Sequence, residues 1–153
     1  VAKAQELVDD AVAKGARLLV GDQEQAPGRN FFMPTLLADV TAHMRVYREE
    51  NFAPVAGVLA WDDLEQLIVQ ANDTEYGLAA YVYGYDMRQV WRLLRGLEFG
   101  MVSVNSVKMT GPPVPFGGVK KSGLGREGSR HGLDEYSQIK YYCLGNLPSA
   151  SGS

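Results

Sequence analysis

The sequence predicts an α/β fold with a parallel sheet, because strand-like and helix-like segments alternate along most of its 153 residues. Apolar segments of strand length occur at 55–61, 78–83 and 101–105, and the first is an unbroken apolar run, as in strands covered on both faces. Helix-length segments with apolar residues three and four apart lie between them. This order is typical of parallel β-α-β units with right-handed crossovers.

The N-terminal part predicts one helix and two strands. Residues Ala4–Ala16 carry apolar side chains at helical spacing, and Gly15 ends the pattern. Arg17–Val20 favours a short strand. Residues 31–40 are apolar and extended around Pro34, which predicts an edge strand because proline cannot donate to a ladder.

The other elements depend on local signals. Residues 43–50 favour a turn that leads into a loop. Aspartates stand where they can cap the next two helices, with Asp62 or Asp63 before the first and Asp86 before the second. Residues 127–133 favour a short helix. No repeat and no internal domain boundary is visible, so one globular domain is expected.

Composition excludes several classes of function. With 15 basic and 18 acidic residues the chain has no basic field, so neither nucleic acid nor a membrane surface is an expected partner. A single cysteine excludes an internal disulfide framework and agrees with a reducing, cytoplasmic compartment. His43 and His131 lack metal-ligand spacing, so no metal is expected. The chain opens without Met or a signal segment, and this suggests a cut within a longer protein.

A glycine-rich stretch, Pro115–Glu127, is the centre of the functional hypothesis. It holds four glycines and only three apolar side chains, a composition unlike a buried helix or strand. Glycines at this density let the backbone pass close to another group, so the stretch predicts a loop shaped around a ligand or another part of the protein. The alternative is an ordinary surface turn.

The string PFGGVKKSGLGRE in this loop resembles the end of an aldehyde dehydrogenase, closest to the succinate-semialdehyde dehydrogenase branch. Four other stretches resemble the same family in the same order: 32–37, 49–55, 71–80 and 100–105. Five collinear motifs are far more specific than one. Agreement runs from about Val1 to Gly145, while family members are roughly three times as long as this chain.

The resemblance implies the C-terminal part of an NAD- or NADP-dependent enzyme that oxidises an aldehyde, with succinate semialdehyde as the expected substrate. Residues 1–135 would belong to the catalytic, thiol-bearing domain, 136–145 would be the oligomerisation strand, and 146–153 a disordered tail. The nucleophile, the general base and the phosphate-binding part of the Rossmann domain would precede Val1. The chain alone is therefore expected to be inactive, and the alternative is a non-catalytic assembly module.

Two candidate cofactor residues lie in one loop. The carboxylate of Glu50 can accept both hydroxyls of a ribose, and Phe52, two residues on in extended backbone, lies on the same side. In the resembled family the matching residues hold the nicotinamide ribose and flank the nicotinamide ring. Without the resemblance, a solvated acid pair with Phe52 in the core is the simpler interpretation.

Three further site residues follow from the resemblance. Thr110 stands where the semialdehyde branch often has a serine that binds the substrate carboxylate, although the following Gly-Pro-Pro departs from that branch and a plain loop hydroxyl is the alternative. Phe116 would border the substrate tunnel. Glu127 would belong to a proton path, and the alternative is an ion pair with Arg126 that fastens the loop. Lys120 and Lys121 are expected to be solvated.

The segment Tyr136–Leu144 alternates as a strand and is rich in tyrosine, which makes it a ready edge for pairing with another subunit. The resemblance implies an intersubunit contact here and a homo-oligomer. The alternative is that the strand completes a sheet within its own chain. Cys143 lies in this segment and is expected to be buried and inert, despite being the only thiol.

Overall fold

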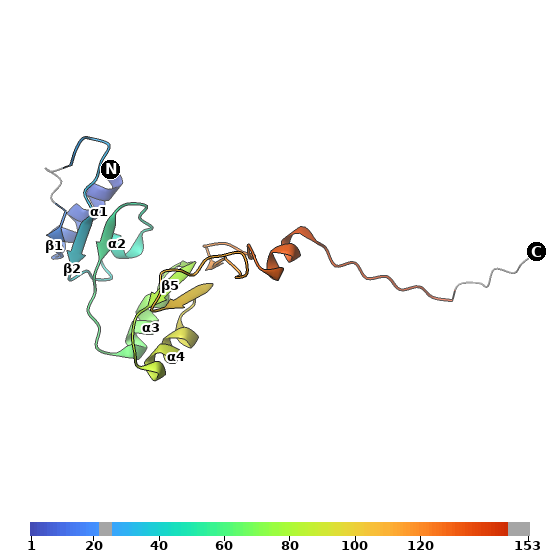
Figure 1. Cartoon of the computed structure of the whole chain (residues 1–153). Coiled ribbons are helices and arrows are strands. Elements are labelled where there is room, and N and C mark those ends of the chain that lie inside the picture. The colour runs from blue at the N-terminus through green and yellow to red at the C-terminus, as the bar shows by residue number, and fades with distance from the viewer. Residues whose placement is uncertain (22–25, 147–153) are drawn as a thin grey trace, which may run out of the picture. The chain divides into compact units, whose positions relative to one another are not determined.

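The computed structural model describes residues 1–21 and 26–146 and divides into two compact units, 1–69 and 70–153, where one domain was expected (Figure 1). Both units mix helices and strands. The expected disordered tail, 146–153, lies outside the described residues except for Asn146.

In the first unit, helix α1 (Ala2–Ala13) packs on a three-stranded sheet of order β1-β2-β3. Strand β1 (Arg17–Val20) is antiparallel to β2 (Thr35–Ala38), which is parallel to β3 (Val55–Gly57). The predicted helix is confirmed, because its buried side chains recur at helical spacing and Gly15 ends it at φ +101°. The core lies between helix and sheet and contains Ala4, Val8, Ala11, Leu37, Met44 and Val55.

Two expectations for this unit are wrong. Strand β2 is central and not an edge, since Pro34 comes just before the ladder and Thr35 N–H makes the first bond to the Pro54 carbonyl at 2.8 Å. The residues expected to form a turn include a short helix, α2 (Arg45–Arg48). Its first N–H, from Arg45, donates to the Asp10 carboxylate at 2.9 Å, so α1 holds α2 in place.

Helix α3 (Leu64–Asn72) begins after Asp63, whose carboxylate accepts from Gln66 N–H at 2.8 Å. Helix α4 (Met87–Gly96) begins after Asp86, which accepts from Arg88 N–H at 2.9 Å. Both caps satisfy backbone donors that have no partner within the helix, as the sequence predicted.

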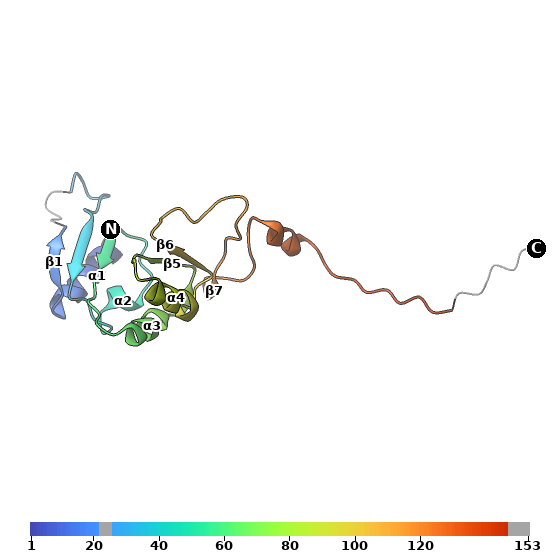
Figure 2. The same ribbon diagram turned by 60° about the horizontal axis from the view of Figure 1, so that its bottom comes forward.

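The second unit contains one β-α-β unit of the predicted kind. Strand β5 (Ala79–Val82) leads through α4 to β6 (Met101–Val104), and the two strands pair in parallel along four residues. Figure 2 shows β5 and β6 side by side. Strands β4 (Tyr76–Gly77) and β7 (Val119–Lys120) form a separate antiparallel pair.

The expected single parallel sheet is not present in the described chain, which has three small sheets of three, two and two strands. Strand β6 is only half-buried, and β3 is exposed at Ala56 and Gly57, so neither is covered on both faces. The helix expected at 127–133 is a 3-10 helix, η2 (Arg130–Tyr136).

The expected strand at 136–144 is not formed within the described chain. Tyr136 ends η2, and residues 137–146 continue as exposed extended chain, seen as the arm that follows η2 in Figure 1. The alternative that this segment completes a sheet in its own chain is therefore wrong. The expectation of a buried thiol is wrong too, since Cys143 is exposed.

Four glycines bring three backbone segments of the second unit together, and we call Gly77, Gly100, Gly117 and Gly118 the glycine junction. Gly100 N–H donates to the Gly77 carbonyl at 3.0 Å. A Cβ on Gly100 would overlap the Gly117 carbonyl oxygen and lie 2.8 Å from Gly118 Cα. A Cβ on Gly77 would lie 2.7 Å from the Glu98 carbonyl oxygen. Only residues without side chains allow this close approach.

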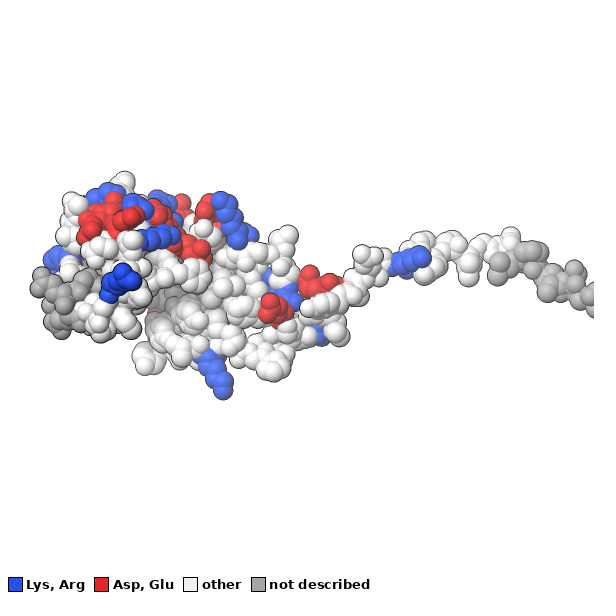
Figure 3. Space-filling model, turned by 90° about the horizontal axis from the view of Figure 1, so that it is seen from above, with Lys and Arg blue, Asp and Glu red and all other residues white. Residues whose placement is uncertain are grey.

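The surface carries charges of both signs. On the face in Figure 3, Lys and Arg side chains lie among Asp and Glu side chains instead of gathering by sign. In the first unit this mixture includes the ion pairs Lys14–Asp10 (2.7 Å) and Arg45–Glu49 (2.6 Å). Among residues 1–21 and 26–146, none of the helices has the length and apolar character needed to cross a membrane.

Candidate functional site

The glycine-rich loop folds back on itself and brings Phe116 and Glu127 together. Phe116 N–H donates to the Glu127 carbonyl at 2.8 Å, and Glu127 N–H donates to the Phe116 carbonyl at 2.7 Å. This reciprocal pair closes the loop at its two ends. The loop lines a pocket of about 200 Å³ with Phe116, Arg126 and Glu127 in its wall, together with Glu135 from η2.

Arg126 fastens this loop from within. Its Nη1 donates to the Gly118 carbonyl at 2.8 Å and to the Gly125 carbonyl at 2.7 Å. The Arg126 side chain passes so close that a Cβ on Gly117 would lie 2.8 Å from Arg126 Cδ and 3.1 Å from its Nη1. The loop is therefore fastened by arginine to carbonyl oxygens, and not by the ion pair with Glu127 that was the alternative. The Glu127 side chain is exposed.

Residues 111–114, which follow Thr110 and which we call the entrance turn, are held against the end of the same loop. Val114 N–H donates to the Gly111 carbonyl at 3.1 Å, which makes residues 111–114 a turn, and Ser129 N–H donates to the Pro112 carbonyl at 2.8 Å. Thr110 stands immediately before this turn and is exposed. Thr110, Phe116 and Glu127 therefore belong to one connected piece of the second unit.

Asn105 lies at the end of β6, and its side-chain amide is bonded to the backbone. Its Nδ2 donates to the Gly84 carbonyl at 2.8 Å, and its Oδ1 accepts from Gly84 N–H at 2.9 Å. The residue has φ +52°, a conformation that asparagine tolerates better than most residues. The side chain connects the ends of β5 and β6.

Glu50 and Phe52 lie in the first unit, in the loop that enters β3. Lys3 Nζ holds this loop through the Glu50 carbonyl at 2.7 Å. The Glu50 side chain is exposed, and the Phe52 ring is 96% exposed, so the core position that was the alternative for Phe52 is wrong. A carboxylate and an uncovered ring on one loop are compatible with a ribose diol and a flat heterocycle.

The neighbouring acid, Glu49, has a different role. The Arg45 guanidinium donates to it, with 2.6 Å between Nε and Oε1, and this hydrogen bond lowers the pKa of the Glu49 carboxyl below its ordinary value. Glu49 is thereby tied to α2. The acids of this loop are therefore not an equivalent solvated pair. Among residues 1–21 and 26–146, no hydrogen bond or ion pair engages the Glu50 carboxylate, so this side chain can bind another partner.

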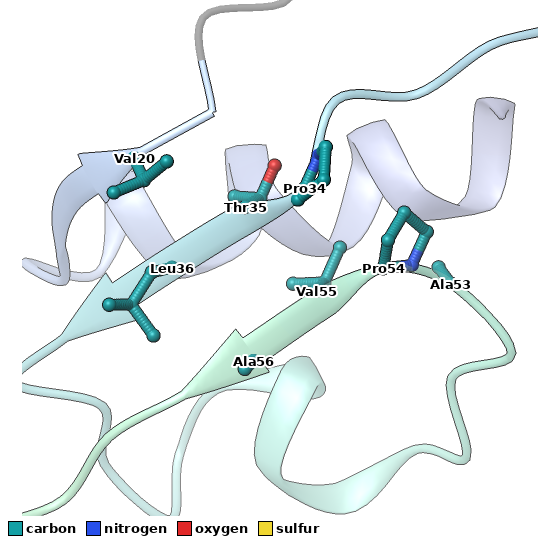
Figure 4. A pocket seen from close by; sticks show the side chains of 8 residues that line it. All are labelled: Val20, Pro34, Thr35, Leu36, Ala53, Pro54, Val55 and Ala56. Atoms are coloured by element: carbon teal, nitrogen blue, oxygen red, sulfur yellow. The ribbon is translucent and has the colours of Figure 1, made fainter.

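An apolar hollow of about 410 Å³ lies beside this loop, on the sheet of the first unit. Figure 4 shows its wall, with Val20 from β1, Leu36 from β2 and Ala56 from β3, and with Ala53 and Pro54 from the loop itself. The open face of the sheet is therefore largely apolar at this hollow. Phe52 directly precedes Ala53, one of the lining residues.

Sequence reasoning missed the role of Lys120. Its Nζ donates to the carbonyl oxygens of Asn72 at 2.9 Å and Thr74 at 3.3 Å and pairs with Glu98 Oε2 at 2.8 Å. The expectation of a solvated side chain is wrong for Lys120. For Lys121 it is confirmed, since that side chain is exposed and pairs with the surface carboxylate of Glu75, whose hydrogen bond raises the pKa of Lys121.

The described part of the chain contains no group of three His, Cys, Asp or Glu side chains that could hold a metal ion. In the same residues, every buried side-chain nitrogen or oxygen has a hydrogen-bond partner. Of the candidate site residues, Glu50, Phe52, Thr110 and Glu127 are exposed and Phe116 is half-buried.

Comparison with known proteins gives the chain its relatives. Residues 1–142 match the model of the "Aldehyde dehydrogenase family". An aspartate-semialdehyde dehydrogenase (non-phosphorylating) of Halomonas elongata is 68% identical over 153 residues, covering 100% of this chain and 31% of the relative. A probable NADP⁺ succinate-semialdehyde dehydrogenase of Sinorhizobium fredii is 49% identical over 92% of this chain and 28% of the relative.

A solved structure supports the same grouping. The succinate-semialdehyde dehydrogenase of Burkholderia pseudomallei is 48% identical and superposes with a TM-score of 0.88, over 94% of this chain and 30% of that one. The chain thus spans less than a third of the length of the relatives it matches.

Proposed function

The chain belongs to the aldehyde dehydrogenase family, and we propose that it serves as the C-terminal part of an NAD- or NADP-dependent enzyme that oxidises an aldehyde to the carboxylic acid. The observation that carries the proposal is the match to this oxidoreductase family over residues 1–142. Because the chain spans about a third or less of its relatives, the activity belongs to the longer protein. The nucleophile and general base are assigned to the part outside this chain.

The proposed substrate is an aldehyde that carries a carboxylate at its other end. The two relatives described above are named for aspartate semialdehyde and succinate semialdehyde, which share this feature. Thr110 offers an exposed hydroxyl at the entrance turn, and a hydroxyl can donate one hydrogen bond to a carboxylate. Succinate semialdehyde is the first candidate, and the 68% identical relative makes aspartate semialdehyde the second.

Glu50 and Phe52 are proposed to bind the cofactor. When bound, a nicotinamide cofactor accepts a hydride from the substrate carbon. The exposed Glu50 carboxylate would accept hydrogen bonds from the ribose hydroxyls, and the uncovered Phe52 ring would lie against the nicotinamide. Lys3 supports this loop from α1 by its hydrogen bond to the Glu50 backbone.

Phe116 and Glu127 are proposed to act together at the substrate end. Their reciprocal backbone bonds fix the two side chains on one frame. Phe116 would border the aldehyde tunnel, and Glu127, as an exposed carboxylate, would pass a proton between the site and water. The Arg126 clamp on Gly118 and Gly125 keeps the loop that carries them in shape.

The second candidate is a non-catalytic assembly role for this chain. The exposed extended chain at 137–146, with Ile139 104%, Tyr141 84% and Tyr142 70% exposed, favours it, because apolar and aromatic side chains in such a segment are suited to pairing with another copy. Both roles hold together for part of a homo-oligomeric, cytoplasmic enzyme. Turnover of an aldehyde by this chain alone would contradict the placing of the nucleophile outside it.

The test uses the full-length protein and steady-state kinetics with either cofactor on succinate semialdehyde, aspartate semialdehyde and butanal. Thr110→Val should reduce kcat/KM for the two charged aldehydes by a factor that corresponds to about 1–3 kcal/mol of transition-state stabilisation, the usual cost of leaving a charged group short of a hydrogen bond. The value of kcat/KM for butanal should stay unchanged. Thr110→Ser keeps the hydroxyl and is the control. Equal losses on charged and neutral aldehydes would contradict carboxylate binding, and a wild-type protein inactive on all three would contradict the proposal as a whole.

A further inference from the structure

The carbonyl oxygens of the entrance turn converge on one residue of the opposite segment, Gly128. A Cβ built there would lie 2.9 Å from the Val114 carbonyl oxygen and 3.5 Å from that of Pro112. Gly128 has φ +68°, and the next residue, Ser129, has φ +51° although it is not a glycine. Two consecutive residues with positive φ turn the chain so that the Ser129 N–H faces the Pro112 carbonyl, 2.8 Å away.

The entrance turn has few other means of attachment. Pro112 and Pro113 have no N–H, and the Val114 N–H is used inside the turn by the Gly111 carbonyl at 3.1 Å. The Ser129–Pro112 bond is therefore the backbone bond that joins residues 111–114 to the rest of the unit in the described chain. The Phe116–Glu127 pair fixes the same two segments a few residues away.

From this geometry we infer that Gly128 and Ser129 position Thr110 and so determine how well the enzyme selects aldehydes that carry a carboxylate. The inference rests on the proposed function, since it assigns a cause to the selectivity of that site. Gly128 allows the turn to lie against it, and Ser129 fixes the turn by its N–H. Both act through Thr110 and are positioning residues, not catalytic ones.

The chain offers a matched pair of glycines for the test. Gly128 and Gly123 both have positive φ, +68° and +112°, so alanine is strained at either position. A Cβ on Gly123 meets nothing within 4 Å, whereas one on Gly128 meets the entrance turn. Gly123→Ala therefore controls for the strain of a positive φ, and a larger effect of Gly128→Ala is assigned to the contact with the turn.

In the full-length enzyme, Gly128→Ala should raise KM for succinate semialdehyde by about ten- to a hundredfold, the range expected when a binding group is displaced by about 1 Å. KM for butanal should stay within about twofold of its wild-type value. Gly123→Ala should leave KM unchanged for both aldehydes. If Gly128 acts through Thr110, the double variant Thr110→Val with Gly128→Ala should be no less selective than Thr110→Val alone. Equal changes on both aldehydes, or full additivity in the double variant, would overturn the inference.

A second measurement needs no variant and remains decisive if Gly128→Ala does not fold. Hydrogen exchange of the wild-type enzyme should show slower exchange at the Ser129 amide with succinate bound than with butyrate bound, because a carboxylate on Thr110 stabilises the turn that this amide holds. Equal exchange with both acids would overturn the inference. A wild-type enzyme without preference for charged aldehydes would instead contradict the proposed function, whereas a preference that survives Gly128→Ala contradicts only the positioning role.

Discussion

Replacing Gly100 by alanine tests the glycine junction most directly. The new Cβ would overlap the Gly117 carbonyl oxygen and lie 2.8 Å from Gly118 Cα, where ordinary contact begins at 3.4 Å. The obstructing atoms are backbone, so they cannot rotate away, and the two segments must separate by roughly 1 Å. That separation works against the bonds from Gly100 N–H to Gly77 (3.0 Å) and from Met101 N–H to Leu78 (3.1 Å).

The expected cost follows from these two effects. Overpacking against rigid surroundings costs about 1–3 kcal/mol, and each weakened backbone hydrogen bond adds about 1 kcal/mol. The free energy of unfolding should therefore fall by about 3–5 kcal/mol. Urea denaturation followed by the fluorescence of Trp91, in α4 of the same unit, reports this loss in a Trp61→Phe background.

The control is Gly84→Ala, whose Cβ would meet only Val90 Cγ2 at 3.8 Å, an ordinary contact. Its free energy of unfolding should stay within about 1 kcal/mol of that of the wild type. If Gly100→Ala unfolds at the same urea concentration as Gly84→Ala, the close approach of the three segments does not exist in solution and the reasoning is refuted.

Two further predictions concern acid stability and assembly. The Arg45 N–H and the Lys14 ammonium hold the pKa of Asp10 below its ordinary 3.8, so the stability that this carboxylate contributes is complete above that pH and is lost as the pH falls through the lower folded value. Asp10→Asn keeps an acceptor but cannot titrate. Its urea midpoint should therefore drop less than that of the wild type between about pH 5 and about pH 3. Equal drops would contradict the role of the Asp10 carboxylate in acid stability. Deleting residues 136–153 should lower the association state of the protein in light scattering, and a folded variant with unchanged mass would exclude the assembly role of this segment.

The sequence predicted those parts of the fold whose causes are local. Three features depend on neighbours within one helix or one β-α-β unit. They are the caps at Asp63 and Asp86, the end of α1 near Gly15, and the parallel pairing of β5 with β6. The central place of β2 could not be predicted, because strand order depends on partners far along the chain. Pro34 misled the prediction because it lies one residue before the ladder.

Burial was predicted less well than secondary structure, for a physical reason. The apolar run 55–61 gave the pattern of a strand covered on both faces, yet Val58 is 47% exposed and Trp61 50%. An apolar pattern reflects all the contacts that a strand makes in the whole protein. This chain spans less than a third of its relatives' length. Such exposed faces agree with the proposal that the chain is part of a longer protein.

The candidate site also combines features that the sequence indicated with features that depend on distant parts of the chain. Resemblance alone indicated Glu50, Phe52 and Thr110, and their roles stay predictions. The pairing of Phe116 with Glu127 depends on the register of a loop that folds back, which composition does not encode. The contact of Gly128 with the entrance turn depends on three carbonyl directions at once. Positive φ at Ser129, a non-glycine residue, gave no signal in the sequence.

Lys120 and Lys121 are neighbours in the chain with unequal chemical availability. An ammonium has three N–H donors, and for Lys120 the carbonyls of Asn72 and Thr74 and the carboxylate of Glu98 supply three acceptors. Its nitrogen therefore has no donor to spare. Its side chain is 25% exposed against 66% for Lys121, so amine-acylating reagents have better access to Lys121. Arginine is no equivalent at position 120, because a planar guanidinium cannot direct its donors as a tetrahedral ammonium does. One amine thus joins the end of α3 to the segment after α4, while the adjacent amine remains open to chemistry at the surface.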